Sequence, residues 1–130
     1  MAWVLLGVGA GFSSTGVLGK EPRPLGELAL AVQFFCDFTS GRDAHWGDLT
    51  MHSEWSKRQI PVIIGADGPK GMRQAARIAD GVFLPGTLPE ILEWREKRLL
   101  EGATAANRTL SDLEVSSPRA GSLNTRPRNA

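Results

Sequence analysis

Glycines are the residues of this sequence whose spacing first suggests chemistry, because a glycine-rich turn after a buried strand can bring backbone N–H groups close to a phosphate. Gly7, Gly9 and Gly11 follow an early apolar run in the spacing G-x-G-x-G. A dinucleotide-binding fingerprint requires G-x-G-x-x-G, and Phe12 occupies the position of its third glycine. No Gly-Lys-Ser/Thr follows, as a Walker-type loop would require. The glycines therefore predict a tight turn at the end of a strand, without naming a ligand.

A second glycine turn lies in the stretch IPVIIGADGPKGMRQAARIADG. Its apolar residues Val62 to Ile64 predict a short buried strand, and Gly65 to Gly68 predict a turn. Pro69 suits the first helical turn, where its missing N–H costs nothing. One face of the helix that follows is expected to carry Met72, Ala75, Ala76 and Ala79.

The rest of the chain continues this alternation of strands and helices. We expect strands near residues 3–8, 61–65 and 81–84, and a helix from Pro24 that ends at Gly41. Thr87-Leu-Pro-Glu90 has the form of a capping box, with Gly102 beyond the end of its helix. Residues 42–59 lose periodicity and are expected to form a loop. The pattern predicts an α/β fold with parallel strands joined by right-handed crossovers.

The opening run AWVLLGVGAG has a second possible interpretation, as the core of a signal peptide. No Lys or Arg lies between Met1 and the run, and it is too short to cross a bilayer. A strand that is buried on both faces is the better interpretation, because Val4, Leu5, Leu6 and Val8 are all apolar.

Composition excludes several classes of partner and site. The formal net charge of +1 over 130 residues supplies no electrostatic footprint for nucleic acid or an anionic membrane. The single Cys36 excludes an internal disulfide framework and lies on the apolar stripe of a helix, which favours a packing role. His45 and His52 are expected to be surface or packing residues rather than metal ligands. A cytoplasmic location is the default expectation.

The segment IPVIIGADGPKGMRQAARIADGVFLPG resembles the signature segment of the bacterial luciferase-like flavin- and deazaflavin-dependent oxidoreductases, in which P-V-x-x-A-A-x-G-P-[KR] precedes a helix and an A-D-G-V strand. LLGVGAGFSSTGVLGKEPRPLGEL is similar to the family's fourth-strand region, and EGATAANRTLSDLEV to the segment before its seventh strand. The resemblance covers roughly residues 3–115 in the family's own order and leans toward the methylenetetrahydromethanopterin reductase branch.

This resemblance implies a partial TIM (β/α)8 barrel of about three βα units, whose cofactor is FMN or the deazaflavin coenzyme F420. The cofactor ring would lie over the barrel mouth, and two loops would hold its phosphate. The cofactor-binding residues implied by the resemblance are Gly9, Gly11, Ala66, Asp67, Gly68, Pro69, Lys70, Gly86 and Thr87.

Two residues depart from the family's pattern. The position after Gly11 is commonly acidic in the family, whereas Phe12 can neither donate nor accept a proton, so no catalytic residue is assigned. Asp67 places a negative charge where a phosphate is expected nearby, unless Lys70 offsets it.

The length of the chain sets the expectation for its function. A barrel of this family needs about 250 residues, so we expect 1–115 to be the middle part of the barrel and 116–130 to be a disordered tail. The expected function is a fragment of a luciferase-like oxidoreductase or monooxygenase acting on small molecules, inactive alone. The alternative is a catalytically dead module for binding or assembly. In either case the unpaired strands predict self-association or a complementing chain.

Overall fold

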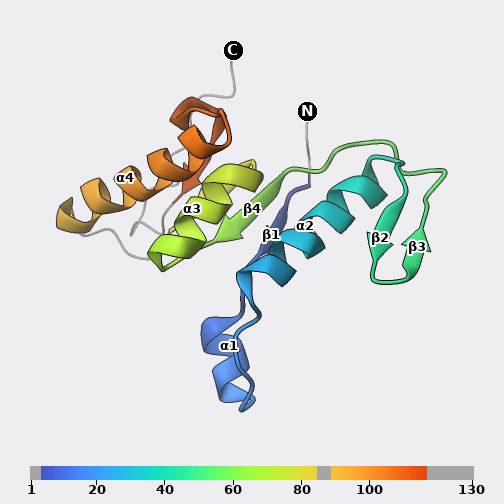
Figure 1. The fold of residues 1–130 in the computed structure, drawn as a ribbon, viewed down its shortest axis with the longest axis horizontal. Helices are drawn as coiled ribbons and strands as arrows, with labels where there is room; N and C mark the ends of the chain where they lie inside the picture. Colours follow the sequence, from blue (N-terminus) through green and yellow to red (C-terminus); the bar gives the residue numbers. More distant parts are fainter. Residues whose placement is uncertain (1–3, 85–88, 117–130) are drawn as a thin grey trace. The chain divides into compact units, whose positions relative to one another are not determined.

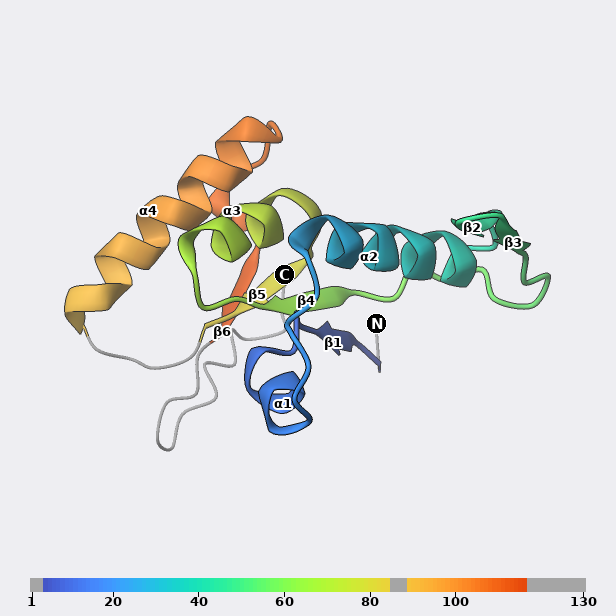
Figure 2. The same ribbon diagram turned by 60° about the horizontal axis from the view of Figure 1, so that its bottom comes forward.

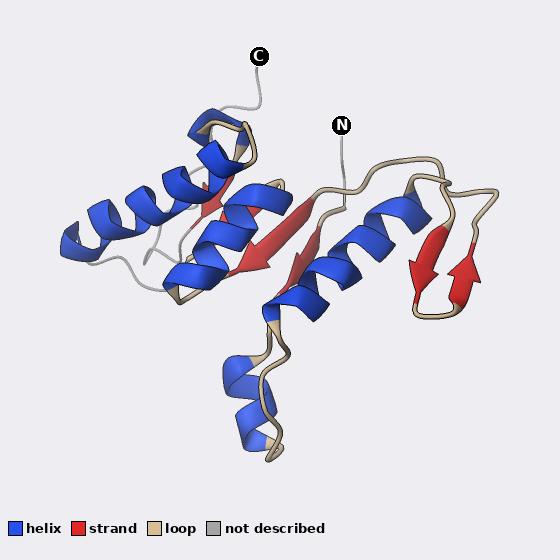
Figure 3. Cartoon of the chain, in the orientation of Figure 1, coloured by secondary structure: helices blue, strands red, loops and turns tan. Residues whose placement is uncertain are grey.

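A computed structural model describes residues 4–84 and 89–116 of the chain. The chain divides into two compact units, Met1–Ile63 and Ile64–Ala130, with the boundary inside a strand. The ribbon in Figure 1 and the cartoon in Figure 3 show the elements in chain order. They are β1 (Leu6–Val8), α1 (Phe12–Val17), α2 (Leu25–Thr39), β2 (Ala44–Trp46), β3 (Leu49–Met51), β4 (Val62–Gly65), α3 (Pro69–Ile78), β5 (Gly81–Phe83), α4 (Pro89–Ala105), a 3-10 turn (Leu110–Asp112) and β6 (Glu114–Ser116).

The main sheet has the strand order β1-β4-β5-β6. Strands β5 and β6 pair in parallel, with Val82 opposite Val115. Within the first unit, the Leu6 N–H donates to the Pro61 carbonyl at 2.9 Å, immediately before β4. The expected α/β fold with parallel strands is confirmed. The strands predicted near residues 3–8, 61–65 and 81–84 are present as β1, β4 and β5.

The second unit is built from alternating strands and helices, β4-α3-β5-α4-β6. Figure 2 shows α3 and α4 on the same side of these strands, the arrangement that two crossovers of the same hand produce. The side chains of Ile64, Met72, Val82 and Leu99 are at most 2% exposed and form the core between strands and helices. Each such burial stabilises by about 1.5–3 kcal/mol.

Helices α3 and α4 approach closely at Gly102. A Cβ built on Gly102 would lie 2.2 Å from the carbonyl oxygen and 2.7 Å from the Cα of Arg73, so only a hydrogen fits between the two backbones. Gly102 lies inside α4, which continues to Ala105. The prediction that Gly102 stands beyond the helix end was therefore wrong, because tertiary packing requires glycine there, rather than helix termination.

An ion-pair cluster joins the same two helices beside this contact. The Arg73 Nε donates to Glu101 Oε2 at 2.8 Å, and Arg98 of α4 pairs with the other oxygen. The hydrogen bond from Arg73 is the main reason that the pKa of the Glu101 carboxyl lies below its ordinary value. Arg98 also lies over the ring of Trp94, with its guanidinium carbon 5.3 Å from the ring centroid.

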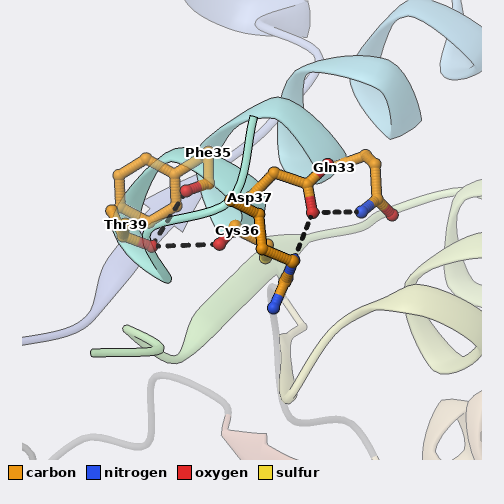
Figure 4. A network of polar contacts seen from close by, with 6 residues as sticks. Gln33, Phe35, Cys36, Asp37 and Thr39 are labelled. Carbon is orange, nitrogen blue, oxygen red and sulfur yellow. Dashed lines mark hydrogen bonds and ion pairs between the residues drawn. The ribbon is translucent and has the colours of Figure 1, made fainter. Parts of the chain in front are cut away.

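In the first unit, α2 ends as the sequence predicted. Gly41 has φ 77°, the left-handed conformation that a glycine after a helix supplies. Figure 4 shows the polar contacts of the last turns, where Asp37 accepts from the amide of Gln33 at 3.0 Å. The Arg42 Nε also donates to Asp37 at 3.0 Å, and the Thr39 hydroxyl donates to the Phe35 carbonyl at 2.9 Å. These contacts satisfy donors and acceptors at the C-terminal end of α2.

Residues 42–59 contain an antiparallel hairpin, β2–β3, where the sequence analysis expected a loop. Trp46 pairs with Leu49 across the two-residue turn Gly47-Asp48, and Gly47 has φ 57°. Glycine at the first central position is typical of type II′ hairpin turns. The Gly-Asp dipeptide between two short runs containing apolar residues was the signal that could have predicted this hairpin.

Strand β1 is shorter and more exposed than predicted. It spans Leu6–Val8, while Val4 and Leu5 lie before it with 64% and 57% of their surface exposed. The expectation of a strand buried on both faces is therefore wrong for this chain: the apolar run has the composition of a buried strand, but Val4 and Leu5 are each more than half exposed.

We predict that Gly102→Ala destabilises the second unit. The new methyl group collides with backbone atoms of Arg73, which cannot rotate away as a side chain would, so the free energy of unfolding should fall by about 1–3 kcal/mol or more. Urea unfolding followed by far-UV circular dichroism measures this loss.

Gly71→Ala in α3 is the matched control. Its Cβ would meet only the Cβ of Ala66, at an ordinary 3.6 Å, so the gain in helix propensity should leave stability equal or slightly higher. Equal midpoints for Gly102→Ala and the unmodified chain would show that the two helices do not pack this closely.

Candidate cofactor site

The loop between β4 and α3 is the better described part of the candidate site. Val62 and Ile64 alternate into the core along β4, and Ala66 continues this alternation with 6% of its surface exposed. The Ala66 N–H donates to the Phe83 carbonyl at 3.0 Å, which anchors the loop to β5. Asp67, Gly68, Pro69 and Lys70 then lie exposed.

Gly68 caps α3 with its backbone alone. Its φ of −92° and ψ of 164° are extended, a conformation that any residue adopts, and a Cβ there would meet nothing within 4 Å. The Gly68 carbonyl accepts the Met72 N–H at 3.0 Å, the first bond of the helix. The fold itself therefore does not require glycine at this position.

The first turn of α3 carries unusual charge for a helix N-terminus. It contains no acidic residue, whereas Lys70 places a cation next to the positive end of the helix dipole. Pro69 has no N–H, and the N–H groups of Lys70 and Gly71 precede the first intrahelical donor. This end of α3 can therefore bind an anion through backbone N–H groups and an ammonium group.

Asp67 is the one acidic residue of the loop and lies directly before the helix cap. Its carboxylate is exposed, so water screens much of its repulsion toward an anion. The loop consequently places one opposing charge beside the positive end of α3.

The glycine loop after β1 lies in the first unit. Gly11 caps α1 in the left-handed conformation, with φ 83°, and its carbonyl accepts the N–H of Thr15 at 2.9 Å and the Thr15 hydroxyl as well. Gly9 is exposed, and Ala10 between the two glycines accepts the Arg23 N–H at 3.0 Å. The glycines thus form the predicted tight turn, whereas the helix after it was not predicted.

The remaining predicted site residues, Gly86 and Thr87, lie outside the described residues. Ala66 to Lys70 lie together as one continuous loop in the second unit, and Gly9 and Gly11 belong to the first. Phe12 begins α1.

The histidines lie on the hairpin and its flank, apart from both loops in sequence. His45 Nδ1 lies 3.0 Å from the Thr50 hydroxyl, and His52 Nδ1 lies 3.0 Å from Asp43; both histidines are exposed.

Over residues 4–84 and 89–116, no group of three or more His, Cys, Asp or Glu side chains is arranged to hold a metal ion. In the same described ranges, none of the helices has the length and apolarity needed to span a membrane.

The family follows from comparison with known proteins. The model of the luciferase-like monooxygenase family matches residues 5–129. The chain belongs to this family, which confirms the resemblance seen in the glycine turns. The match continues beyond Val115, the point at which the sequence analysis ended the resemblance.

Individual relatives point to one branch of the family. The 5,10-methylenetetrahydromethanopterin reductase of Archaeoglobus fulgidus is 27% identical over 114 residues, which are 81% of this chain and 34% of that protein. The enzyme of the same name from Methanopyrus kandleri is 38% identical over 56 residues, 43% of this chain and 16% of that protein. The chain therefore spans about a third or less of the length of these curated relatives.

Solved structures show the same fold. The coenzyme F420 dependent tetrahydromethanopterin reductase from Methanopyrus kandleri matches with a TM-score of 0.70 at 20% identity, over 87% of this chain and 40% of that one. An F420-dependent secondary alcohol dehydrogenase in complex with an F420-acetone adduct matches with a TM-score of 0.65 at 20% identity, over 88% of this chain and 38% of that one. These matches confirm the expected part of a TIM barrel.

The two capping glycines should respond differently to substitution. Gly11→Ala forces an L-residue into the left-handed region, at a cost of about 1–2 kcal/mol. Gly68→Ala meets open space in an extended conformation, so it should lose less stability than Gly11→Ala, with only the weaker capping by alanine acting against it. Urea midpoints of the two variants provide the comparison, and a large loss for Gly68→Ala would show that the loop packs differently.

Proposed function

We propose that this chain is part of an oxidoreductase that uses coenzyme F420, and that the loop Ala66–Lys70 holds the cofactor's phosphate. The two solved structures named above, both described as F420-dependent, support this cofactor. Gly9 and Gly11, together with Gly86 and Thr87, complete the proposed set of cofactor contacts.

The observation that carries the proposal is the glycine cap of α3. A side-chain cap such as Asp or Ser would satisfy the first N–H groups of the helix and stabilise it, yet Gly68 leaves these groups available. The open space at the Gly68 Cβ position and the cation of Lys70 fit a phosphate oxygen that approaches the backbone closely.

The residues of this chain are proposed to bind and orient the cofactor, rather than to carry out proton transfer. When bound and reduced, F420 supplies a hydride, which is the redox chemistry of the reaction. The N–H groups of Lys70 and Gly71 and the Lys70 ammonium group hold the phosphate in place. Phe12 has no ionisable group, so no acid or base is assigned there.

Asp67 favours F420 over FMN at this loop. FMN ends in a phosphomonoester that carries nearly two negative charges at neutral pH, whereas F420 carries a phosphodiester with one. Repulsion from the Asp67 carboxylate grows with the charge of the phosphate, so the phosphodiester suffers less. The proposed activity is therefore a reductase acting on a small molecule, rather than a monooxygenase that uses reduced FMN and oxygen.

The chain alone is proposed to bind cofactor without turnover, in the cytoplasm, where a thiol such as that of Cys36 stays reduced. A binding or assembly module without catalysis remains the alternative function. Cofactor titration separates the two, because an assembly module has no reason to bind F420 with saturation.

We predict that Gly68→Asp abolishes binding of F420 while slightly raising stability. Aspartate is a favoured cap, so its carboxylate should bond the free N–H groups of α3 and add a few tenths of a kcal/mol. The same carboxylate occupies the place of the phosphate and repels it. Titration of the purified chain with F420, followed by fluorescence, measures binding, and a thermal melt measures stability.

Gly26→Asp is the matched control, because Gly26 is exposed in α2, meets nothing within 4 Å at its Cβ position, and receives the same charge. It should bind as the unmodified chain does. Phe12→Ala should also leave the phosphate contact intact. Saturable binding that survives Gly68→Asp would place the phosphate elsewhere.

We also predict that Asp67→Asn strengthens FMN binding more than F420 binding. Removing one exposed carboxylate changes an interaction with a phosphate by roughly two- to fivefold, and the effect on the dianion exceeds that on the monoanion. Parallel titrations with both cofactors at low and high salt give the ratio. An unchanged ratio would show that Asp67 does not face the phosphate.

A further inference from the structure

The outer strand of the hairpin is an open edge within the first unit. Strand β3 is the second strand of a two-stranded sheet, and all of its residues are exposed. Figure 3 shows β3 on the side of the hairpin that faces away from α2. Neither Pro nor a charged residue, the usual protection of an edge, lies within Leu49–Met51.

One face of this hairpin is apolar and only partly covered. The register places Trp46 opposite Leu49, with Met51 two residues further on the same face. Trp46 contacts the Phe34 ring of α2 edge to face at 6.3 Å, yet 43% of its surface stays exposed, as do 55% of Leu49 and 40% of Met51. The opposite face carries the polar pair His45 and Thr50.

The backbone of β3 presents a self-complementary edge. Because the two-residue turn joins the paired residues Trp46 and Leu49, Leu49 and Met51 direct their N–H and C=O groups toward β2. Thr50 directs its N–H and C=O outward. Two copies of this strand in antiparallel orientation can therefore exchange two hydrogen bonds between their Thr50 residues.

We propose that β3 is a homodimer contact, in which β3 of a second copy adds antiparallel to it with Thr50 on the two-fold axis. The two hairpins then form one four-stranded sheet, with the apolar side chains of both copies on the same face. Leu49 lies opposite Met51 of the second copy, so the most exposed apolar pair of each hairpin is joined across the axis.

Charge complementarity fixes this register. With Thr50 opposite Thr50, the next outward-facing residues are paired as well, Asp48 with His52 of the second copy. In the protonated ring of His52 both nitrogens donate: Nδ1–H to Asp43, 3.0 Å away, which orients the ring, and Nε2–H to the incoming carboxylate. A shift of the register by two residues would lose both acid–histidine pairs, so one alignment is favoured.

The contact is small, so the dimer should be weak. Five residues from each copy form an interface below the size of a stable complex, and we expect a dissociation constant on the order of 10–100 μM. The proposed dimer contact does not depend on cofactor binding. All of its residues lie between Asp43 and His52, outside both candidate cofactor loops.

Sedimentation of the full chain over a range from about 1 to 500 μM tests the proposal. Thr50→Pro removes the outward N–H without removing a bond to β2, so the hairpin should persist while the dissociation constant rises at least about tenfold. Thr50→Ala is the matched control, since it also loses the hydroxyl but keeps the N–H, and it should still dimerise. Near-UV circular dichroism, to which Trp46 contributes together with the other three tryptophans, verifies that each variant keeps the aromatic packing of the unmodified chain.

Crosslinking provides the second measurement. In a Cys36→Ser background, Thr50→Cys should be joined between copies by a short bismaleimide, because the two Cα atoms would lie about 5.5 Å apart. His45→Cys, on the inner strand, should react far less. A chain that stays monomeric at 500 μM, or a dimer that Thr50→Pro leaves unweakened, would overturn the proposal.

Discussion

The close approach of α3 and α4 at Gly102 is the constraint on which the second unit depends. The space between the Gly102 Cα and the backbone of Arg73 has room for a hydrogen atom but not for a side chain. The ion pairs of Glu101 hold the same two helices together beside this contact. Helix α3 is fixed against α4, and Ala66 is fixed to β5 by its hydrogen bond to the Phe83 carbonyl. The loop between β4 and α3 is therefore anchored at both of its ends. The orientation of the α3 N-terminus is therefore set by packing some distance away from it.

Patterns within a few residues predicted most of the fold. Alternation along β4 and the proline after Gly68 gave a strand, a turn and a helix start in the right places. Gly102 shows the limit of such patterns, because a glycine that ends a helix and one that admits a neighbouring helix look the same in sequence. The difference lies in Arg73, which is 29 positions earlier in the chain.

The candidate site was predictable only through its resemblance to a family. The residues Ala66 to Lys70 read as an ordinary turn by themselves, and the turn at Gly11 gave no ligand. The structure adds the physical distinction between the two glycines, since φ is 83° at Gly11 and −92° at Gly68. The hairpin was missed for a different reason: its strands of three residues are too short for periodicity to register.

The bare cap of α3 has an evolutionary consequence. Aspartate, serine and asparagine are all better caps than glycine, and the backbone at Gly68 accepts each of them without strain. Selection for stability alone would therefore replace glycine at this position, because no loss in folding opposes the change. The persistence of glycine among descendants of this sequence would thus record selection for a ligand, whereas its loss would mark lineages in which the domain was kept only for its shape.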